Sequence, residues 1–306
     1  MQQAFYLLSK DRGVIAIAGD DRHSFLQGLV SNDVRRTAAD RAVYAALLTP
    51  QGRYLHDFFI AAIGDTFYLD CEADRRGDLL RRLSLYRLRS KVTLAEATDS
   101  FAVALLFGQD VLDSFGLPFE PGRAIPLEGG CVYVDPRLPE LGARAILPRQ
   151  HAVESLQRRG LIVGAIEDYA RLRLSLGVPD GSRDLPVEKA ILLENGFDEL
   201  HGIDWEKGCY MGQELTARTK YRGLVRKRLL PVAVDGPLPA PGTPVMHGEA
   251  EAGEMRSGDD GLGLALLRLE HLDGGPLTAG GSRIIPRRPS WLKLPDPQQA
   301  VPDPKS

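Results

Sequence analysis

The chain has 306 residues, of which 43% are hydrophobic and 26% charged, and its formal net charge is −3. This composition is typical of a soluble protein with two or three compact units, and the charge argues against coating nucleic acid through bulk charge. Three widely spaced cysteines indicate a reducing compartment, and no pair or cluster has metal-site spacing, so no metal is expected. The N-terminus lacks a signal-peptide pattern and no apolar run could span a bilayer, so we expect a cytoplasmic protein without a membrane partner.

The first hundred residues alternate strand-like and helix-like segments. Asp20 and Asp21 supply an N-cap signal for the first helix, and the turn Pro50-Gln51-Gly52 separates two apolar runs in the manner of a hairpin. The second helix carries leucines at helical spacing with arginines on its other side. Strands are predicted at residues 14–18, 42–48, 54–63 and 66–71, and helices at 22–30 and 73–88. This order indicates an α+β fold.

The middle of the chain repeats the alternation more loosely. Strands are predicted at residues 91–95, 101–107, 131–134 and 143–147, and helices at 110–115, 151–159 and 165–176. From residue 229 the chain is rich in Gly and Pro with short apolar runs, which predicts a small β-barrel. We therefore expect a region at 1–228, a barrel at 229–288 and an extended Pro-rich tail at 289–306.

The most unusual stretch surrounds Cys209. Gly208 and Gly212 flank it and permit backbone geometry that other residues avoid. Lys207 could lower the pKa of the thiol by favouring the thiolate, and a helix that opens near Met211 would place its positive end beside the sulfur. An activated, partly exposed thiol is one interpretation, and a small buried hydrophobic residue is the other.

The run from Lys207 to Glu214, K-G-C-Y-M-G-Q-E, resembles the signature of the YgfZ family. Its continuation to Arg228 is similar to the mitochondrial iron–sulfur assembly branch of that family. Motifs at residues 25–34, 48–57 and 171–179 agree in order, so the resemblance covers roughly residues 5 to 285.

The YgfZ family shares its fold with the T-protein of the glycine cleavage system, an aminomethyltransferase that uses tetrahydrofolate. The resemblance therefore implies a T-protein-like ring of three subdomains around a central folate cavity. Glu194 matches the folate-contacting glutamate of the family, and a carboxylate can accept two N–H bonds from a pterin. Asn32 and Asp33 could reach the same cavity, although both are also ordinary turn formers. The other folate-binding residues implied are Arg173, Lys207 and Tyr210.

The resemblance implies a folate-binding protein that acts in [4Fe-4S] cluster assembly or repair through Cys209 and Lys207, with carrier or client proteins as partners. A tetrahydrofolate-dependent aminomethyltransferase with Asp57 as catalytic acid is the alternative, so enzymatic turnover stays open. His56 stands where T-proteins carry a second acid, and T-proteins lack the cysteine motif. Both departures favour the role in cluster assembly.

A basic run follows the cysteine motif and contains no acidic residue. It is either a solvated face, where Lys and Arg are common, or an anion site. The anion could be a folate polyglutamate tail, an acidic partner or RNA, which makes an interaction module the third hypothesis. The run comprises Arg218, Lys220, Arg222, Arg226, Lys227 and Arg228.

Overall fold

The computed structural model describes residues 3–221, 223, 225–272 and 274–294. Internal contacts divide the chain into two units. The first comprises residues up to 48, 55–169 and 200–211, and the second comprises 49–54, 170–199 and the chain from 212. The expected boundaries after residues 228 and 288 stay predictions.

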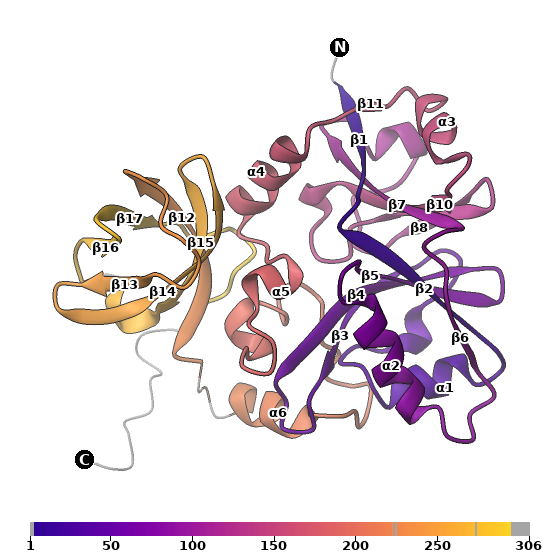
Figure 1. Cartoon of the computed structure of the whole chain (residues 1–306), viewed down its shortest axis with the longest axis horizontal. Helices are drawn as coiled ribbons and strands as arrows, with labels where there is room; N and C mark the ends of the chain where they lie inside the picture. The colour runs from indigo at the N-terminus through magenta and orange to yellow at the C-terminus, as the bar shows by residue number, and fades with distance from the viewer. Residues whose placement is uncertain (1–2, 222, 224, 273, 295–306) are drawn as a thin grey trace. The chain divides into compact units, whose positions relative to one another are not determined.

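A five-stranded sheet in the first unit contains the expected hairpin (Figure 1). Leu69 on its central strand lies opposite Ile15 on one neighbour and Ile60 on the other, and all three side chains are fully buried. Both strands of the hairpin are buried over almost their whole length, which explains their continuous apolar runs. The strand order is β3 (Val43–Leu48), β4 (Tyr54–Ile63), β5 (Thr66–Glu72), β2 (Arg12–Ala18) and β6 (Thr93–Glu96).

A six-stranded sheet completes the first unit. Its strands β1, β8 and β11 were not predicted, whereas β7, β9 and β10 confirm predicted strands. One face covers a core that includes Leu106, Val132 and Ala145, with Leu156 from a short helix packed into the same cluster. The strand order is β11 (Ile162–Val163), β1 (Ala4–Leu8), β7 (Phe101–Gly108), β10 (Ala143–Pro148), β9 (Gly130–Val134) and β8 (Ala124–Leu127).

Helices of the first unit are shorter than their sequence patterns. In α2 the buried side chains of Leu79 and Leu83 lie one turn apart, as the leucine spacing predicted. This helix ends before Leu88, which has a left-handed backbone with a φ of 41°. The helices are α1 (Arg22–Gln27), α2 (Arg76–Tyr86) and α3 (Ala152–Gln157), with 3-10 turns η1 (Val34–Arg36), η2 (Asp113–Phe115) and η3 (Pro139–Leu141). The predicted helix at 165–176 is α4 (Ile166–Leu176), which runs from the first unit into the second.

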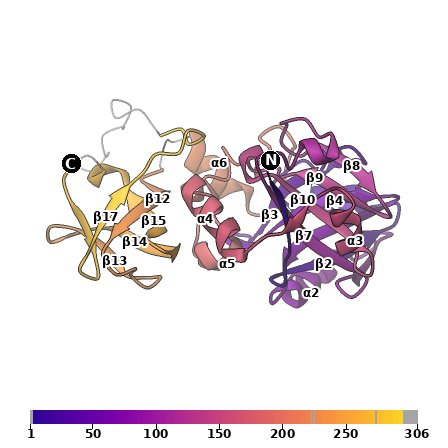
Figure 2. The same cartoon turned by 90° about the horizontal axis from the view of Figure 1, so that it is seen from above.

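The second unit contains a closed six-stranded barrel, which confirms the predicted β-barrel (Figure 2). Its interior holds Leu230, Val232, Met255 and Leu267, all fully buried. The register shifts after Val245, and such a bulge bends a strand as a small closed barrel requires. The strand order is β12 (Lys227–Asp235), β15 (Leu262–Arg268), β14 (Ala250–Asp259), β13 (Pro244–His247), β16 (Leu277–Ala279) and β17 (Ser282–Pro286).

Short helices accompany the barrel in the second unit. The turn that contains Gly52 packs against α6, where a Cβ on Gly52 would lie 2.6 Å from the Cβ of Leu215. Trp291 donates its indole N–H to the carbonyl of Leu176 at 2.7 Å. The elements are α5 (Gly181–Asp184), η4 (Leu192–Asn195), α6 (Gln213–Tyr221) and η5 (Leu269–His271). None of the helices in this described part of the chain has the length and hydropathy that a membrane crossing needs.

A buried cluster of charged side chains joins the two sheets of the first unit. Asp70 on β5 accepts from the Nε of Arg12 at 2.5 Å and from the Nη2 of Arg144 on β10 at 2.6 Å. Burial alone would raise the pKa of Asp70, but Arg12 and Arg144 hold that pKa below its ordinary value. The Arg144 guanidinium lies 4.0 Å from the centre of the Phe59 ring.

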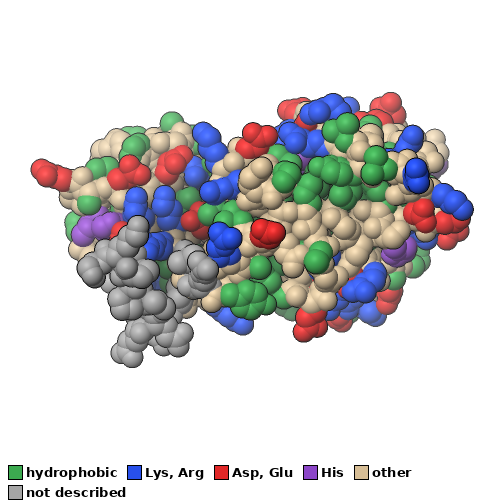
Figure 3. Space-filling view, turned by 90° about the horizontal axis from the view of Figure 1, so that it is seen from below, with side chains coloured by type: hydrophobic (Ala, Val, Ile, Leu, Met, Phe, Trp, Pro, Cys, Tyr) green, Lys and Arg blue, Asp and Glu red, His purple; other side chains and the backbone are tan. Residues whose placement is uncertain are grey.

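The face of the molecule drawn in Figure 3 carries side chains of both charge signs together with hydrophobic side chains.

We expect Asp70→Asn to destabilise the protein by roughly 3–5 kcal/mol, because it removes the carboxylate that two buried guanidinium groups share. Urea denaturation measures the free energy of unfolding. The control is Asp65→Asn, whose side chain is fully exposed and 3.9 Å from Arg22; it should change stability by less than about 1 kcal/mol. Equal stability of the two variants would show that the cluster does not hold the sheets together.

Candidate functional site

Cys209 is exposed, whereas Cys71 and Cys131 are buried. Burial raises the pKa of both buried thiols to about 12, so they stay protonated at neutral pH. The interpretation of Cys209 as a small buried hydrophobic residue is therefore wrong. Of the three sulfurs, the one in the K-G-C-Y motif is accessible to a reaction partner.

The loop that carries Cys209, residues 201–211, is fastened to the turn after α1. The Oγ of Ser31 donates to the carbonyl of Gly202 at 2.6 Å, and the amide of Asp204 donates to the carbonyl of Ser31 at 3.0 Å. Beyond the cysteine, the amide of Met211 donates to the carbonyl of Gly28 at 3.1 Å. Gly208, with a φ of 92°, supplies the left-handed bend immediately before the thiol.

Lys207 is buried, and its ammonium group lies at the C-terminal end of α1. The Nζ donates to the carbonyls of Gln27 at 2.7 Å and Val30 at 2.5 Å, and it lies 5.0 Å from the centre of the Tyr210 ring. These contacts satisfy carbonyls that a helix end leaves unpaired. Burial lowers the pKa of Lys207 to about 8. Its predicted role as the cation beside the thiol stays a prediction, as does the role of Tyr210 toward folate.

Asp57 is buried on β4 and accepts a hydrogen bond from the hydroxyl of Tyr44 at 2.8 Å. Burial, then the nearby Asp57, raises the pKa of Tyr44 well above its ordinary value, so the phenol keeps its proton. His56 points to the other face of the strand, as strand geometry requires, and contacts Asp78 at 2.9 Å. Burial, then Arg75, lowers the pKa of His56 to about 4, so this ring is neutral at pH 7.

Asn32 and Asp33 make the local contacts of turn-forming residues. The Nδ2 of Asn32 donates to the carbonyls of Tyr44 and His201, each at 2.7 Å. Asp33 caps η1 by accepting from the amide of Arg35 at 3.0 Å, and the Arg35 side chain, foremost, lowers the pKa of Asp33. Neither contact tests the predicted roles in folate binding.

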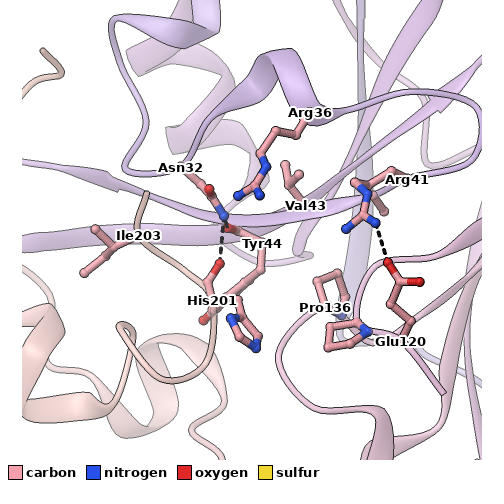
Figure 4. Close-up of a pocket in the computed structure, with 11 residues that line it drawn as sticks. Asn32, Arg36, Arg41, Val43, Tyr44, Glu120, Pro136, His201 and Ile203 are labelled. Carbon is pink, nitrogen blue, oxygen red and sulfur yellow. Dashed lines mark hydrogen bonds and ion pairs between the residues drawn. The ribbon is translucent and has the colours of Figure 1, made fainter. Parts of the chain in front are cut away.

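A cavity of about 260 Å³ opens beside these residues within the first unit (Figure 4). Asn32 and Tyr44 line one side, and Arg41 lies across from them in an ion pair with Glu120 at 2.5 Å. Sequence reasoning missed Tyr44, because its link to Asp57 depends on two strands of the hairpin facing each other. The remaining lining residues are Arg36, Ala42, Val43, Pro121, Pro136, His201 and Ile203.

Two predicted folate-binding residues belong to the second unit. Arg173 is buried and donates to Asp184 at 2.8 Å and to the Oγ of Ser257 at 3.0 Å. Its guanidinium therefore links α5 to β14 within the second unit. Glu194 on η4 is half-buried, and burial raises the pKa of its carboxyl group. The surrounding cations Lys227, Arg53, Arg256 and Arg228 oppose this rise.

The basic run is partly neutralised inside the second unit. Arg228 is buried, donates to the carbonyl of Leu193 and pairs with Glu199 at 2.5 Å. Lys220 pairs with Asp198 at 3.0 Å. Arg222 lies outside the described residues. The run is therefore not a uniform free cationic face, and an RNA partner is unsupported.

Comparison with known proteins first defines the fold. Residues 10–113 match the family described as the GCVT N-terminal domain, and residues 226–294 match the CAF17 C-terminal beta-barrel domain. The crystal structure of the glycine cleavage system aminomethyltransferase T from Bartonella henselae superposes with a TM-score of 0.73 at 17% identity, covering 93% of this chain and 84% of that one. The predicted T-protein-like α+β fold with a C-terminal barrel is confirmed.

Sequence relatives then define the family. The mouse protein named iron-sulfur cluster assembly factor IBA57, mitochondrial, is 35% identical over 291 residues, covering 86% of this chain and 77% of the relative. The homolog from Neosartorya fischeri is 32% identical over 352 residues, covering 97% and 77%. The chain belongs to the IBA57 family of iron–sulfur cluster assembly factors, and the resemblance to the mitochondrial-type branch is confirmed.

One expectation is corrected by these relatives. The sequence predicted a cytoplasmic protein because no targeting pattern was recognised at the N-terminus. The mouse, human and Neosartorya fischeri relatives are all named as mitochondrial proteins, and this finding overturns that prediction.

Lys207 makes stability depend on pH in a definite direction. Its pKa is about 8 in the folded protein against an ordinary value of 10.5, so between these values the unfolded chain binds the extra proton. The free energy of unfolding should therefore gain a contribution as pH rises from about 8 to 10.5. In urea titrations, Lys207→Met should lose this contribution, whereas Lys10→Met, at an exposed lysine, should keep it. Parallel pH profiles for wild type and Lys207→Met would contradict the assignment.

Proposed function

We propose that this protein acts in iron–sulfur cluster assembly and that the exposed thiol of Cys209 is its contact point with the cluster or with a carrier. The observation that carries the proposal is the contrast among the three cysteines. Cys209 is exposed on a loop held by hydrogen bonds, whereas Cys71 and Cys131 are buried. Thiolates are the usual protein ligands of iron–sulfur clusters, which take four of them. Because Cys71 and Cys131 are inaccessible, other ligands to such a cluster would come from a partner.

We further propose that the protein binds tetrahydrofolate, which carries one-carbon units. Glu194 suits the amino-pyrimidine edge of a pterin because it combines partial burial with a carboxylate. Its neighbours Arg228 and Arg256 each have a buried Nε–H group with no acceptor within the described part of the chain. Such groups favour a polar, acceptor-rich ligand.

The role of Cys209 is tested in cells that lack the gene. We expect Cys209→Ala to fail to restore the activities of [4Fe-4S] enzymes, because no other exposed cysteine can replace its sulfur. Cys71→Ala is the matched control and should restore them, with protein levels compared by immunoblot. Full rescue by Cys209→Ala would remove the thiol from the mechanism.

The folate site is tested by anaerobic calorimetry with tetrahydrofolate. We expect Glu194→Gln to weaken binding by about tenfold or more, because a charged acceptor of hydrogen bonds becomes a neutral amide of the same shape. Glu214→Gln, an exposed glutamate on α6, and Cys209→Ala should bind as tightly as wild type. Absence of binding by the wild-type protein would exclude tetrahydrofolate as a ligand.

A further inference from the structure

The C-terminal end of α2 exposes large apolar side chains next to one another. Leu85 is 65% exposed, Tyr86 40% and Leu88 88%, although the same helix buries Leu79 and Leu83. We call residues 85–91 the α2 tip. Single exposed leucines are ordinary, but three large apolar side chains within four positions form a patch.

Backbone geometry presents Leu88 at the point of a turn. The amide of Ser90 donates to the carbonyl of Arg87 at 2.8 Å, which closes the turn around Leu88 and Arg89. Leu88 has a φ of 41°, a left-handed conformation that costs free energy for a leucine. With its side chain in solvent, Leu88 gains little packing in its own unit to offset that cost. Packing within its own unit therefore does not explain the conformation of Leu88.

The α2 tip is anchored at its far end. The amide of Lys91 donates to the carboxylate of Asp21 at 2.7 Å. Gly19 approaches the same residue so closely that a Cβ would lie 2.1 Å from the carbonyl oxygen of Lys91. Since both contacts fix the backbone where the turn ends, Leu88 is presented from a fixed base, and less conformational entropy is lost on binding.

The α2 tip itself carries three basic residues and no acidic one. From residue 79 to 95 the sequence holds no acidic residue. Within the described part of the chain, the side chains of Arg87, Arg89 and Lys91 form no ion pair, whereas Arg81, six residues before Arg87, is paired with Asp78. The carboxylate of Asp21 accepts the Lys91 amide at the base of the turn. Three cations thus lie within three positions of Leu88 in the chain, and the carboxylate of Asp21 holds the backbone where the turn ends.

We propose that the α2 tip is a docking surface for an acidic protein with an apolar recess that receives Leu88. Unpaired cations around an apolar centre are complementary to a recess edged by Asp and Glu, and charges of this kind at the rim steer association. Resting on the proposed function, this inference assigns the partner to the iron–sulfur proteins that exchange a cluster with Cys209. Contacts at the α2 tip increase the affinity for the partner without involving the thiol of Cys209.

The partner is identified and mapped by photo-crosslinking in cells. Benzoylphenylalanine replaces Leu88 in the full chain, and the control carries it at Phe119, which is 66% exposed in the same unit. We expect one iron–sulfur protein to crosslink at position 88 and not at position 119, through a peptide rich in Asp and Glu. Adducts between two copies of this chain, or no specific adduct at position 88, would overturn the proposal.

Affinity is then measured with the purified crosslinked protein. Leu88→Ser and Arg89→Glu should each raise the Kd about tenfold or more, and added salt should weaken the wild-type complex. Lys10→Glu, a charge reversal at an exposed lysine of the same unit, should leave the Kd unchanged. Unchanged affinity for Leu88→Ser would refute docking through the tip. Sedimentation with cardiolipin-containing vesicles that depends on Leu88 would show a membrane anchor instead.

Activity in cells separates the two proposals. If Leu88→Ser restores [4Fe-4S] enzyme activities fully and Cys209→Ala does not, the docking surface is wrong and the proposed function stands. If both variants restore them, the proposed function fails as well. Partial rescue by Leu88→Ser that improves when the protein is overexpressed is the result expected of a weakened complex.

Discussion

The buried carboxylate of Asp70 is the interaction on which the arrangement of the first unit depends. It lies on one sheet and pairs with Arg144 on the other, while Arg12 from its own sheet also donates to it. A shift of one sheet against the other would separate these buried charges, and a buried charge without its partner is costly in a medium of low dielectric.

Buried arginines of the first unit also contact aromatic rings next to the candidate site. Arg144 and Arg137 both lie over the ring of Phe59, at 4.0 and 4.9 Å from its centre, and Arg137 also lies 5.6 Å from the centre of the Tyr44 ring. Tyr44 in turn holds Asp57. Tyr44, which lines the cavity, is therefore in contact with side chains that lie next to the buried charges.

The cysteine loop combines accessibility with a fixed position. The backbone on both sides of Cys209 is hydrogen-bonded to the turn after α1. Lys207 adds an ammonium group that reaches two carbonyls of that turn. The lysine of the motif thus has a structural task, whatever it also does for the thiol. This arrangement suits a group that must meet a partner repeatedly in one orientation.

Local pattern determined much of this protein from sequence. Leucine spacing located α2, the Pro-Gln-Gly turn located the hairpin, and the K-G-C-Y motif singled out Cys209 among the three cysteines. In each case the signal and the structure lie within a few residues of each other. Strand β14, A-E-A-G-E-M-R-S-G-D, has no such signal and was missed, because its neighbours in the barrel supply the hydrogen bonds that make it a strand.

Tertiary structure alone decided what the polar residues do. The acceptors of the Lys207 ammonium group lie 180 and 177 residues earlier in the chain, and Asp70 meets Arg144 across 74 residues. Sequence spacing does not encode such distances. The sequence also left open which thiols are buried and which cations of the basic run are paired. Those properties arise only when distant segments fold together, since burial and pairing depend on neighbours in space.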